Sequence, residues 1–215
     1  MKFKQLKKRL KQPFMPFICY CRRLLLKNID FSIISNNCWG GFVYQYFGLG
    51  YRTPFIGLFI NTPCYLKLLK NIDLIYEKLR FIQASESRYI TYMKEADIYD
   101  KYPIGVLGED IEIHFLHYSS AEEARMKWEK RLPRLNRNNL LVKFNQTSPS
   151  PDLLTEFDQL PYKNKICFTA GVFPEIKSAI FLSRFRHEGQ VRFEHRYYRK
   201  HMNIVKYLNS MFKNE

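Results

Sequence analysis

Short apolar runs alternate with amphipathic stretches along most of the chain. Largely apolar runs at 31–35, 54–60 and 104–107 predict buried strands, because a strand covered on both faces reads as a mainly hydrophobic segment. Residues 110–118 alternate apolar and polar side chains and predict the clearest strand of the chain. Four further segments carry weaker strand patterns: 89–93, 140–144, 166–169 and 179–182.

Helical spacing and terminal residues predict the helices between these strands. Gly48 ends a helix that begins at Cys38, and Thr62 begins a second helix. Ser120 with Glu123 three residues later forms a capping box, which begins a third helix. The predicted helices span 38–47, 62–80, 120–131, 151–157 and 194–212.

The alternation of strands and helices predicts an α/β fold. We expect a single domain over residues 29–215, in which a largely parallel sheet is flanked by helices in a Rossmann-like arrangement. Residues 1–28 form a basic amphipathic N-terminal segment in this interpretation. A chain of 215 residues, 46% of them hydrophobic, is long enough for one large core and too apolar for a disordered protein.

Positive charge is concentrated at the start of the chain. The net charge is +15, and residues 1–29 hold nine Lys or Arg and no acidic residue, interleaved with bulky apolar side chains. This combination favours an anionic membrane surface as a partner. The alternative is a basic helix that packs Leu6 and Leu10 on the domain. Because helix-turn-helix, RNP-type and zinc-finger patterns are missing from the sequence, we expect no specific nucleic acid partner.

The sequence predicts a cytoplasmic protein, with peripheral attachment to the inner face of the membrane as an extension. Its apolar runs are far shorter than the ~20 residues of a membrane-spanning helix. The Lys-rich start is interrupted by Pro13 and Pro16 and lacks a small-residue cleavage site, so we interpret it as retained. Five cysteines without a Cys-x-x-Cys pair indicate neither a disulfide framework nor a zinc ribbon, which fits a reducing compartment.

The first candidate site is the polar turn SNNCWGG at 35–41, between a predicted strand and a predicted helix. Ligands bind at the carboxyl ends of strands in open α/β sheets, where helix N-termini present free N–H groups. A cysteine in the first helical turn has a stabilised thiolate, so Cys38 is a candidate nucleophile. The alternative is a buried structural cysteine beside an anchoring tryptophan. The candidate substrate-binding residues of this turn are Asn36, Asn37, Trp39, Gly40 and Gly41.

The second candidate site is the strand predicted at 110–118. With a period of two, Asp110, Glu112 and His114 share one face, while His117 lies on the other. We expect Glu112 and His114 to serve acid–base catalysis and His117 to act as a base beside the cysteine. A weaker alternative is that Asp110 and Glu112 hold a divalent cation against a diphosphate; no other metal site is predicted. The alternative is that this face carries ordinary surface charge in contact with solvent.

Arg131, Arg134 and Asn136 form a third candidate site, near the end of the helix predicted at 120–131. Guanidinium groups bind phosphates and carboxylates in bidentate fashion, so we expect these residues to hold the phosphates of a donor substrate. The alternative is an exposed helix end whose bases offset the helix dipole. A mixed cluster of Arg, His and Tyr at 184–201 is interpreted as the solvated face of the C-terminal helix.

Several strings of the sequence resemble a bacterial family of unknown function. Its members are often labelled exopolysaccharide or capsule biosynthesis proteins, and sometimes acetyltransferases. The resemblance covers residues 29–170 and implies a role in surface-polysaccharide assembly at the cytoplasmic side of the membrane, without an established reaction or catalytic residue. The strings are FSIISNNCWGG, PFIGLFI, DIEIHFLHY, the Trp-x-x-Arg-x-x-Arg core of 122–136, and KICFT.

We therefore expect a transferase of exopolysaccharide or capsular polysaccharide biosynthesis. In an acyl-transfer version, Cys38 or a sugar hydroxyl attacks, His117 is the base, and an acyl-CoA is the donor. In a glycosyl-transfer version, a nucleotide-sugar is the donor, and Asp110 and Glu112 hold a metal–diphosphate or act as base. The acceptor is a saccharide or a lipid-linked saccharide in either version. The alternative is a non-catalytic module that docks polysaccharide assembly on the membrane surface.

Overall fold

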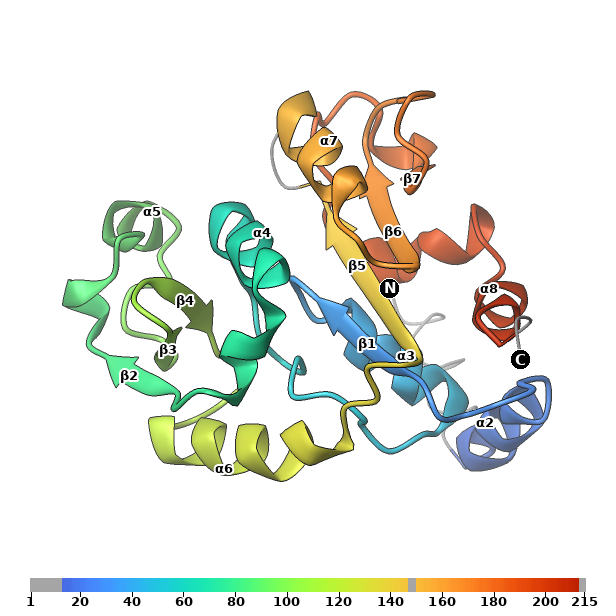
Figure 1. The fold of residues 1–215 in the computed structure, drawn as a ribbon, viewed down its shortest axis with the longest axis horizontal. Coiled ribbons are helices and arrows are strands. Elements are labelled where there is room, and N and C mark those ends of the chain that lie inside the picture. Colours follow the sequence, from blue (N-terminus) through green and yellow to red (C-terminus); the bar gives the residue numbers. More distant parts are fainter. Residues whose placement is uncertain (1–12, 147–149, 213–215) are drawn as a thin grey trace.

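Two β-sheets organise the protein in a computed structural model, which describes residues 13–146 and 150–212 (Figure 1). The larger sheet has four parallel strands in the order β1–β5–β6–β7. The smaller sheet has three antiparallel strands in the order β2–β3–β4. The strands are β1 (Ser32–Ser35), β2 (Arg80–Ile82), β3 (Ile104–Leu107), β4 (Ile111–His114), β5 (Leu140–Asn145), β6 (Asn164–Thr169) and β7 (Ala179–Phe181).

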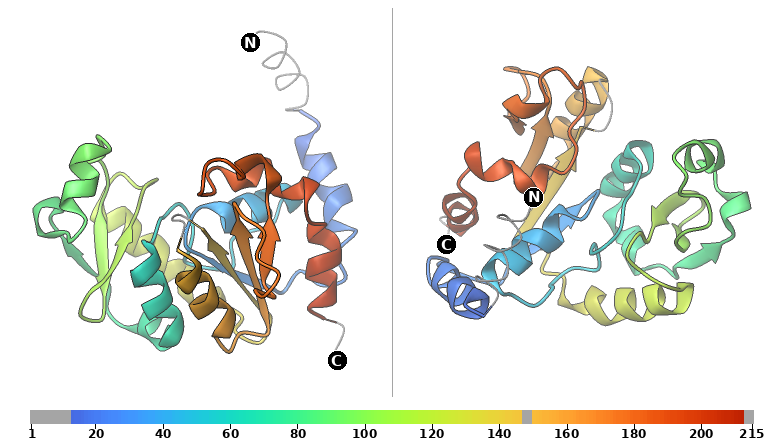
Figure 2. Two further views of the ribbon diagram at one scale, coloured as in Figure 1. Left: turned by 90° about the horizontal axis from the view of Figure 1, so that it is seen from above. Right: turned by 180° about the vertical axis from the view of Figure 1, so that it is seen from behind.

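Helices cover both faces of the parallel sheet (Figures 1 and 2). Helices α4 and α7 pack on one face, where they share a core with Ile34, Phe144 and Cys167. Helices α3 and α8 pack on the other face, around Ile33 and Phe168. The helices are α2 (Met15–Arg23), α3 (Trp39–Phe47), α4 (Thr62–Lys70), α5 (Ile90–Glu95), α6 (Ala121–Arg131), α7 (Pro151–Gln159) and α8 (Ile204–Ser210).

The chain completes its parallel sheet only after a long excursion. Strand β1 pairs with β5, although residues 36–139 lie between them in the sequence. This intervening segment contains α3, α4, the small sheet and α6. It returns to the amino end of β1, where the Asn136 N–H donates to Ser32 Oγ at 2.8 Å. Because β1 and β5 are parallel neighbours, the turns that follow them lie at the same edge of the sheet.

The α/β fold predicted from the sequence is confirmed. The apolar runs correctly predict β1, β3, β5, β6 and β7. Helix α3 ends at Gly48, which has a left-handed backbone with φ of 62°. Helix α6 begins after Ser120, whose hydroxyl accepts a hydrogen bond from the Glu123 N–H at 3.1 Å. The small antiparallel sheet is an addition to the predicted fold. Its first strand, β2, has no apolar run or alternating pattern that would predict a strand.

Two predicted strands have a different structure. Residues 54–60 form a buried loop, in which Gly57 has a φ of 70° and Phe59 makes an isolated β-bridge. The apolar side chains of this loop fill the core instead of pairing in a sheet. Residues 89–93 instead contain the start of α5. This short helix buries Met93 and leaves the adjacent side chains exposed to solvent. In both segments, burial rather than strand propensity determines the conformation.

Three predicted elements are shorter than expected. Strand β4 ends at His114, so the alternating pattern that follows does not continue the strand. Helix α4 ends at Lys70, and a separate 3-10 helix follows at Ile72–Tyr76. The helix predicted at 194–212 is interrupted at Tyr197, where φ is −119°. That region contains two 3-10 turns, Glu194–Arg196 and Tyr198–Lys200, before α8 begins.

Helix α2 packs against the end of α3. Cys19 is buried there, and a Cβ atom placed on Gly48 would lie 2.9 Å from the Cβ of Cys19. The left-handed backbone of Gly48 is a second reason for glycine at this position. Residues 1–12, which hold six of the bases of the N-terminal segment, lie outside the described residues.

We expect Gly48→Ala to lower the free energy of unfolding by about 2 kcal/mol, because it adds left-handed strain and crowds Cys19. Gly50→Ala is the matched control, since a Cβ there meets no atom within 4 Å. Its effect should stay within about 0.5 kcal/mol. Urea denaturation followed by circular dichroism measures both variants. Equal losses would contradict the close approach of α2 to α3.

Candidate functional site

A pocket of about 900 Å³ opens at the carboxyl ends of β1 and β5. This edge is where ligands bind in open parallel α/β sheets. The turn after β1, the segment after β4 and the C-terminal segment 190–196 supply its walls; we call it the β1/β5 pocket. Its lining residues are Asn37, Cys38, Trp39, Phe42, Phe59, Asn61, Tyr92, Ala96, Leu116, His117, Asn145, Gln190, Val191, Arg192, Phe193, Glu194, His195 and Arg196.

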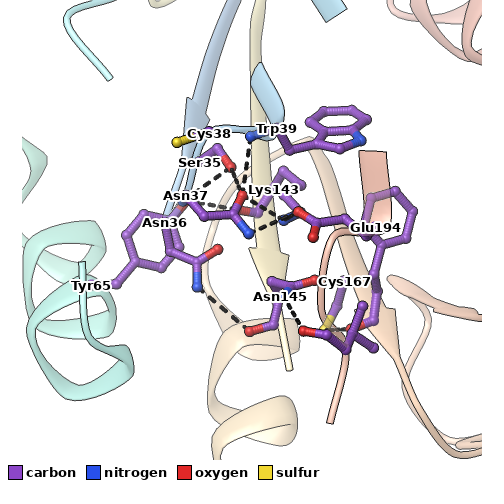
Figure 3. Close-up of polar contacts among 12 residues, drawn as sticks. Ser35, Asn36, Asn37, Cys38, Trp39, Tyr65, Lys143, Asn145, Cys167 and Glu194 are labelled. Carbon is purple, nitrogen blue, oxygen red and sulfur yellow. Dashed lines mark hydrogen bonds and ion pairs between the residues drawn. The ribbon is translucent and has the colours of Figure 1, made fainter. Parts of the chain in front are cut away.

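A buried ion pair joins two walls of the pocket (Figure 3). The Nζ atom of Lys143, on β5, lies 2.6 Å from Oε1 of Glu194. Asn37 contacts both groups: its Oδ1 accepts from Lys143 at 3.0 Å and its Nδ2 donates to Glu194 at 2.7 Å. Burial opposes ionisation of Glu194, yet Lys143 and Asn37 hold the pKa of that carboxyl below its usual value. The three side chains therefore form a charged, hydrogen-bonded unit.

The wall formed by residues 190–196 is fixed to the end of β5 at two further points. Asn145 Nδ2 donates to the Val191 carbonyl at 2.8 Å, and the Val191 N–H donates to the Gln146 carbonyl at 2.8 Å. Between these contacts and the buried ion pair, Phe193 has a positive φ of 52°. Such a conformation is costly for a bulky residue and persists only where its surroundings enforce it. It leaves the ring of Phe193 63% exposed at the pocket.

The mouth of the pocket is aromatic and cationic. Phe42, Tyr92 and Phe193 are large exposed side chains, and all three line it. His195 stacks on Phe42 with ring centroids 3.9 Å apart, and the Arg196 guanidinium lies 5.3 Å from the centre of the Phe193 ring. Large apolar side chains gathered on a surface mark sites for a ligand or partner. The mouth therefore has the chemistry to bind a molecule that combines rings with negative charge.

Cys38 lines the pocket with an unactivated thiol. Burial raises the pKa of Cys38 to about 11; Glu194 adds to this effect, and Lys143 opposes it. The Sγ atom lies 3.7 Å from the Leu58 carbonyl oxygen, to which it donates, and points away from the ion pair (Figure 3). A nucleophilic cysteine requires a lowered pKa. At neutral pH the Cys38 side chain is therefore a neutral thiol, which weakens the nucleophile interpretation.

His117 lines the same pocket as Cys38, so the structure brings these two candidate residues together. It lies beyond the end of β4, and its backbone N–H donates to the Gly57 carbonyl at 3.0 Å. Gly57 has a φ of 70°, and a Cβ atom there would lie 3.2 Å from the Cβ of His117. Glycine therefore permits the contact that holds the His117 backbone. The imidazole itself is exposed and accessible to a bound ligand.

Glu112 and His114 form a buried cluster in the small sheet. Glu112 accepts hydrogen bonds from Ser87 Oγ at 2.5 Å and from the Arg88 N–H at 2.9 Å. His114 Nε2 lies 3.8 Å from Glu112 Oε2 and 3.3 Å from Asn61 Nδ2. Burial lowers the pKa of His114 to about 4, although Glu112 opposes the shift, so the imidazole is neutral at pH 7. Asn61 connects this cluster to the β1/β5 pocket.

A guanidinium contacts both carboxylates of the metal alternative, Asp110 and Glu112. Arg88 Nη2 lies 3.2 Å from Asp110 Oδ2, and Arg88 Nε lies 3.5 Å from Glu112 Oε1. Lys67 also pairs with Asp110 and lowers its pKa. The positive charge between these acids is thus supplied by the protein. Within the residues that the structure describes, no three His, Cys, Asp or Glu side chains gather as a metal-binding group.

The remaining residues of the turn after β1 are occupied with packing. Gly40 and Gly41 are buried, and a Cβ atom on Gly40 would lie 3.1 Å from Cγ2 of Ile33. Gly40 therefore allows α3 to approach β1 closely, and neither glycine lines the β1/β5 pocket. Asn36 is buried and donates to a backbone carbonyl of β5 at 3.5 Å. Trp39 lines the pocket but is 1% exposed, so little of its surface is available to a ligand.

Arg131, Arg134 and Asn136 lie at the opposite edge of the parallel sheet. Asn136 Nδ2 donates to the Asp30 carbonyl, before β1 begins, at 3.2 Å. Arg134 donates to the Tyr51 carbonyl at 3.4 Å, and Arg131 donates to a tyrosine hydroxyl at 2.7 Å. The chain after α6 must return to the start of β5, which places these residues at the amino ends of the strands. These three residues therefore do not line the β1/β5 pocket, and their role in holding a donor stays a prediction.

Comparison with known proteins identifies the family. Residues 9–212 match a family described as a domain of unknown function, DUF1919. The chain belongs to the DUF1919 family. An uncharacterized protein of Haemophilus influenzae is 35% identical over 172 residues, which cover 77% of this chain and 74% of that protein. The resemblance to a family of unknown function is confirmed, whereas its link to exopolysaccharide or capsule stays a prediction.

The sequence patterns did not reveal the C-terminal wall of the pocket. In this DUF1919 protein the segment interpreted as a solvated helix face supplies Phe193, Glu194 and Arg196 to the pocket. One signal was available: Lys143 is the single charged residue in the strand predicted at 140–144. A lysine in a buried strand requires an acidic partner. That partner lies 51 residues further along the chain, too far for sequence spacing to identify it.

We expect His114 to make the stability of this DUF1919 protein pH-dependent. Its folded-state pKa of about 4 lies below the usual 6.5, so the unfolded chain binds a proton first as the pH falls. Stability present above pH 6.5 is then lost towards pH 4, by up to about 3 kcal/mol from this residue. His114→Gln should flatten this part of the pH profile. Urea denaturation at pH 7, 5.5 and 4 tests it, and parallel profiles would contradict a neutral, buried imidazole.

We expect Glu194→Gln to lower the free energy of unfolding by about 3–5 kcal/mol, because the Lys143 ammonium is left buried without its counter-charge. The double variant Lys143→Met/Glu194→Gln should recover a large part of this loss, since no buried charge remains. A double-mutant cycle by urea denaturation measures the coupling. If the losses caused by Glu194→Gln alone and by Lys143→Met alone simply add up in the double variant, the two groups do not act as a pair.

Proposed function

We propose that the protein is a transferase of surface-polysaccharide biosynthesis whose β1/β5 pocket binds a phosphate-bearing donor. The observation that carries the proposal is the mouth of the pocket, where exposed aromatic rings and arginines meet at the carboxyl edge of a parallel sheet. The resemblance to proteins labelled exopolysaccharide or capsule biosynthesis supplies the polysaccharide context.

The donor is recognised through its phosphates and its rings. Nucleotide-sugars and acyl-CoA both carry a nucleotide and a diphosphate. Arg192 and Arg196 line the mouth and offer guanidinium groups to phosphate oxygens. Phe42 and Phe193 offer ring faces to a base or a sugar, while Asn61 offers an amide to hydroxyl groups. A volume of about 900 Å³ is at the large end of small-molecule pockets and has room for a donor with part of an acceptor.

The reaction proceeds by direct transfer, with His117 as the base. Its imidazole takes the proton of an acceptor hydroxyl, and the hydroxyl oxygen bonds to the carbon of the transferred group. The bond from that carbon to the diphosphate or thiol leaving group breaks, and the leaving group departs with the electron pair. Guanidinium groups at the mouth stabilise the negative charge of a departing diphosphate. A covalent intermediate on Cys38 is disfavoured, because burial raises the pKa of its thiol to about 11.

Binding of a donor tests the pocket. We expect isothermal titration calorimetry to detect binding of at least one compound among UDP-glucose, GDP-mannose and acetyl-CoA. Arg196→Ala should weaken that binding about tenfold, because it removes a charge-assisted contact to phosphate. Arg186→Ala is the matched control, since Arg186 also lies over an aromatic ring, 5.4 Å from the centre of Phe181, but does not line the pocket. Equal weakening by both variants would contradict the proposed donor site.

The polymer itself identifies the reaction. Mass spectrometry should compare polysaccharide and its precursors from cells with the intact gene, without it, and with His117→Ala. A missing sugar identifies glycosyl transfer, and a missing acetyl group identifies acyl transfer. The non-catalytic alternative predicts a lower yield of an unchanged polymer and full complementation by His117→Ala. That result would overturn the transferase proposal.

A further inference from the structure

Helix α2 exposes an apolar stripe to solvent. Phe14, Phe17 and Leu24 are between 64% and 67% exposed, and Tyr20 is 49% exposed. The spacing of three and seven residues places Phe14, Phe17 and Leu24 on one face of a helix. A surface helix of a globular protein normally turns its apolar stripe inward. Figure 2 shows α2 along the outside of the molecule. The exposed fractions of these side chains show that no described element covers the stripe.

The opposite face of α2 is held firmly against the domain. Cys19 packs beside Gly48 at the end of α3, and Arg22 donates to the Tyr46 carbonyl at 3.3 Å. Beyond the helix, Asn209 of α8 accepts a hydrogen bond from a backbone N–H and donates one to a backbone carbonyl, at 2.8 and 2.9 Å. The outward orientation of the apolar stripe is therefore a fixed property of the fold.

The charged residues in the sequence of this N-terminal segment are all basic. Residues 1–29 contain nine Lys or Arg and no Asp or Glu. Arg22 and Arg23 donate to the carbonyl oxygens of Tyr46 and Gly48, which are neutral acceptors, so these two hydrogen bonds do not neutralise the guanidinium charges. A second copy of the chain docked through this face would bring two such segments together, and their like charges would repel. An anionic surface is attracted to the same segment.

We propose that α2 docks the protein on an anionic lipid bilayer, lying in the plane of the interface. Its apolar side chains would enter the boundary between headgroups and acyl chains, while the surrounding bases contact anionic headgroups. Among the described residues, no helix combines the length and apolar character needed to cross a membrane. The docking surface on α2 shares no residue with the lining of the β1/β5 pocket. The docking proposal therefore does not depend on the function proposed for that pocket.

Vesicle sedimentation with the full chain tests this surface. We expect the protein to sediment with phosphatidylcholine vesicles that contain phosphatidylglycerol, and not with vesicles of phosphatidylcholine alone. Phe17→Glu/Leu24→Glu should reduce the partition coefficient at least about tenfold, because it removes apolar insertion and adds negative charge. Tyr76→Glu/Met126→Glu is the matched control, since both side chains are more than half exposed elsewhere on the surface and should leave binding unchanged.

Unfolding curves of both double variants must match the wild-type curve, so that a loss of binding reflects the surface. Equal sedimentation of the wild type and the α2 variant would overturn the proposal. The main rival explanation is a dimer formed through the α2 stripe, and sedimentation equilibrium without lipid tests it. If the wild type is a dimer and the α2 variant is a monomer, the stripe binds a second copy of the chain and the proposal is overturned. The α2 variant should retain donor binding, so the result of the vesicle experiment is independent of the function proposed for the pocket.

Discussion

The buried ion pair between Lys143 and Glu194 determines how the two halves of the pocket meet. Burying a charge in a protein core is costly unless it is paired and hydrogen-bonded. Lys143 satisfies this condition only when Glu194 is brought from the C-terminal segment and Asn37 from the turn after β1. The ion pair therefore joins three parts of the chain, and it holds the wall in which Phe193 keeps its strained backbone.

This arrangement separates the charged groups of the site by role. Groups in the interior are either paired, as in the ion pair, or neutral, as for Cys38 and His114, whose pKa values are shifted by burial. The Arg196 guanidinium lies at the mouth of the pocket, over the Phe193 ring. Helix α3 links this site to the rest of the surface, because it begins at the pocket and ends where α2 packs. At 1.5 Å per residue its length is about 13 Å, so a membrane-docked α2 would keep the pocket near the bilayer.

The sequence predicted those features that depend on local patterns. The apolar runs of β1 and β5, the glycine that ends α3 and the capping serine of α6 are each determined by neighbouring residues, and all were predictable. The apolar run at 54–60 was misleading, because core packing demands the same side chains as a buried strand. The C-terminal wall was missed for a different reason. Its conformation follows from contacts with Lys143, Asn145 and Gln146, which no periodicity within the segment encodes.

The pairing of β1 with β5 has a consequence for synthesis on the ribosome. Ser32 and Asn136, which bond at the start of these strands, are 104 residues apart. At translation speeds of about 5–20 residues per second, β1 emerges about 5–20 seconds before its partner and meanwhile exposes an unpaired edge. The small sheet, whose strands pair with sequence neighbours, can form during that interval. The nascent chain would then complete its peripheral lobe first and close its central sheet last.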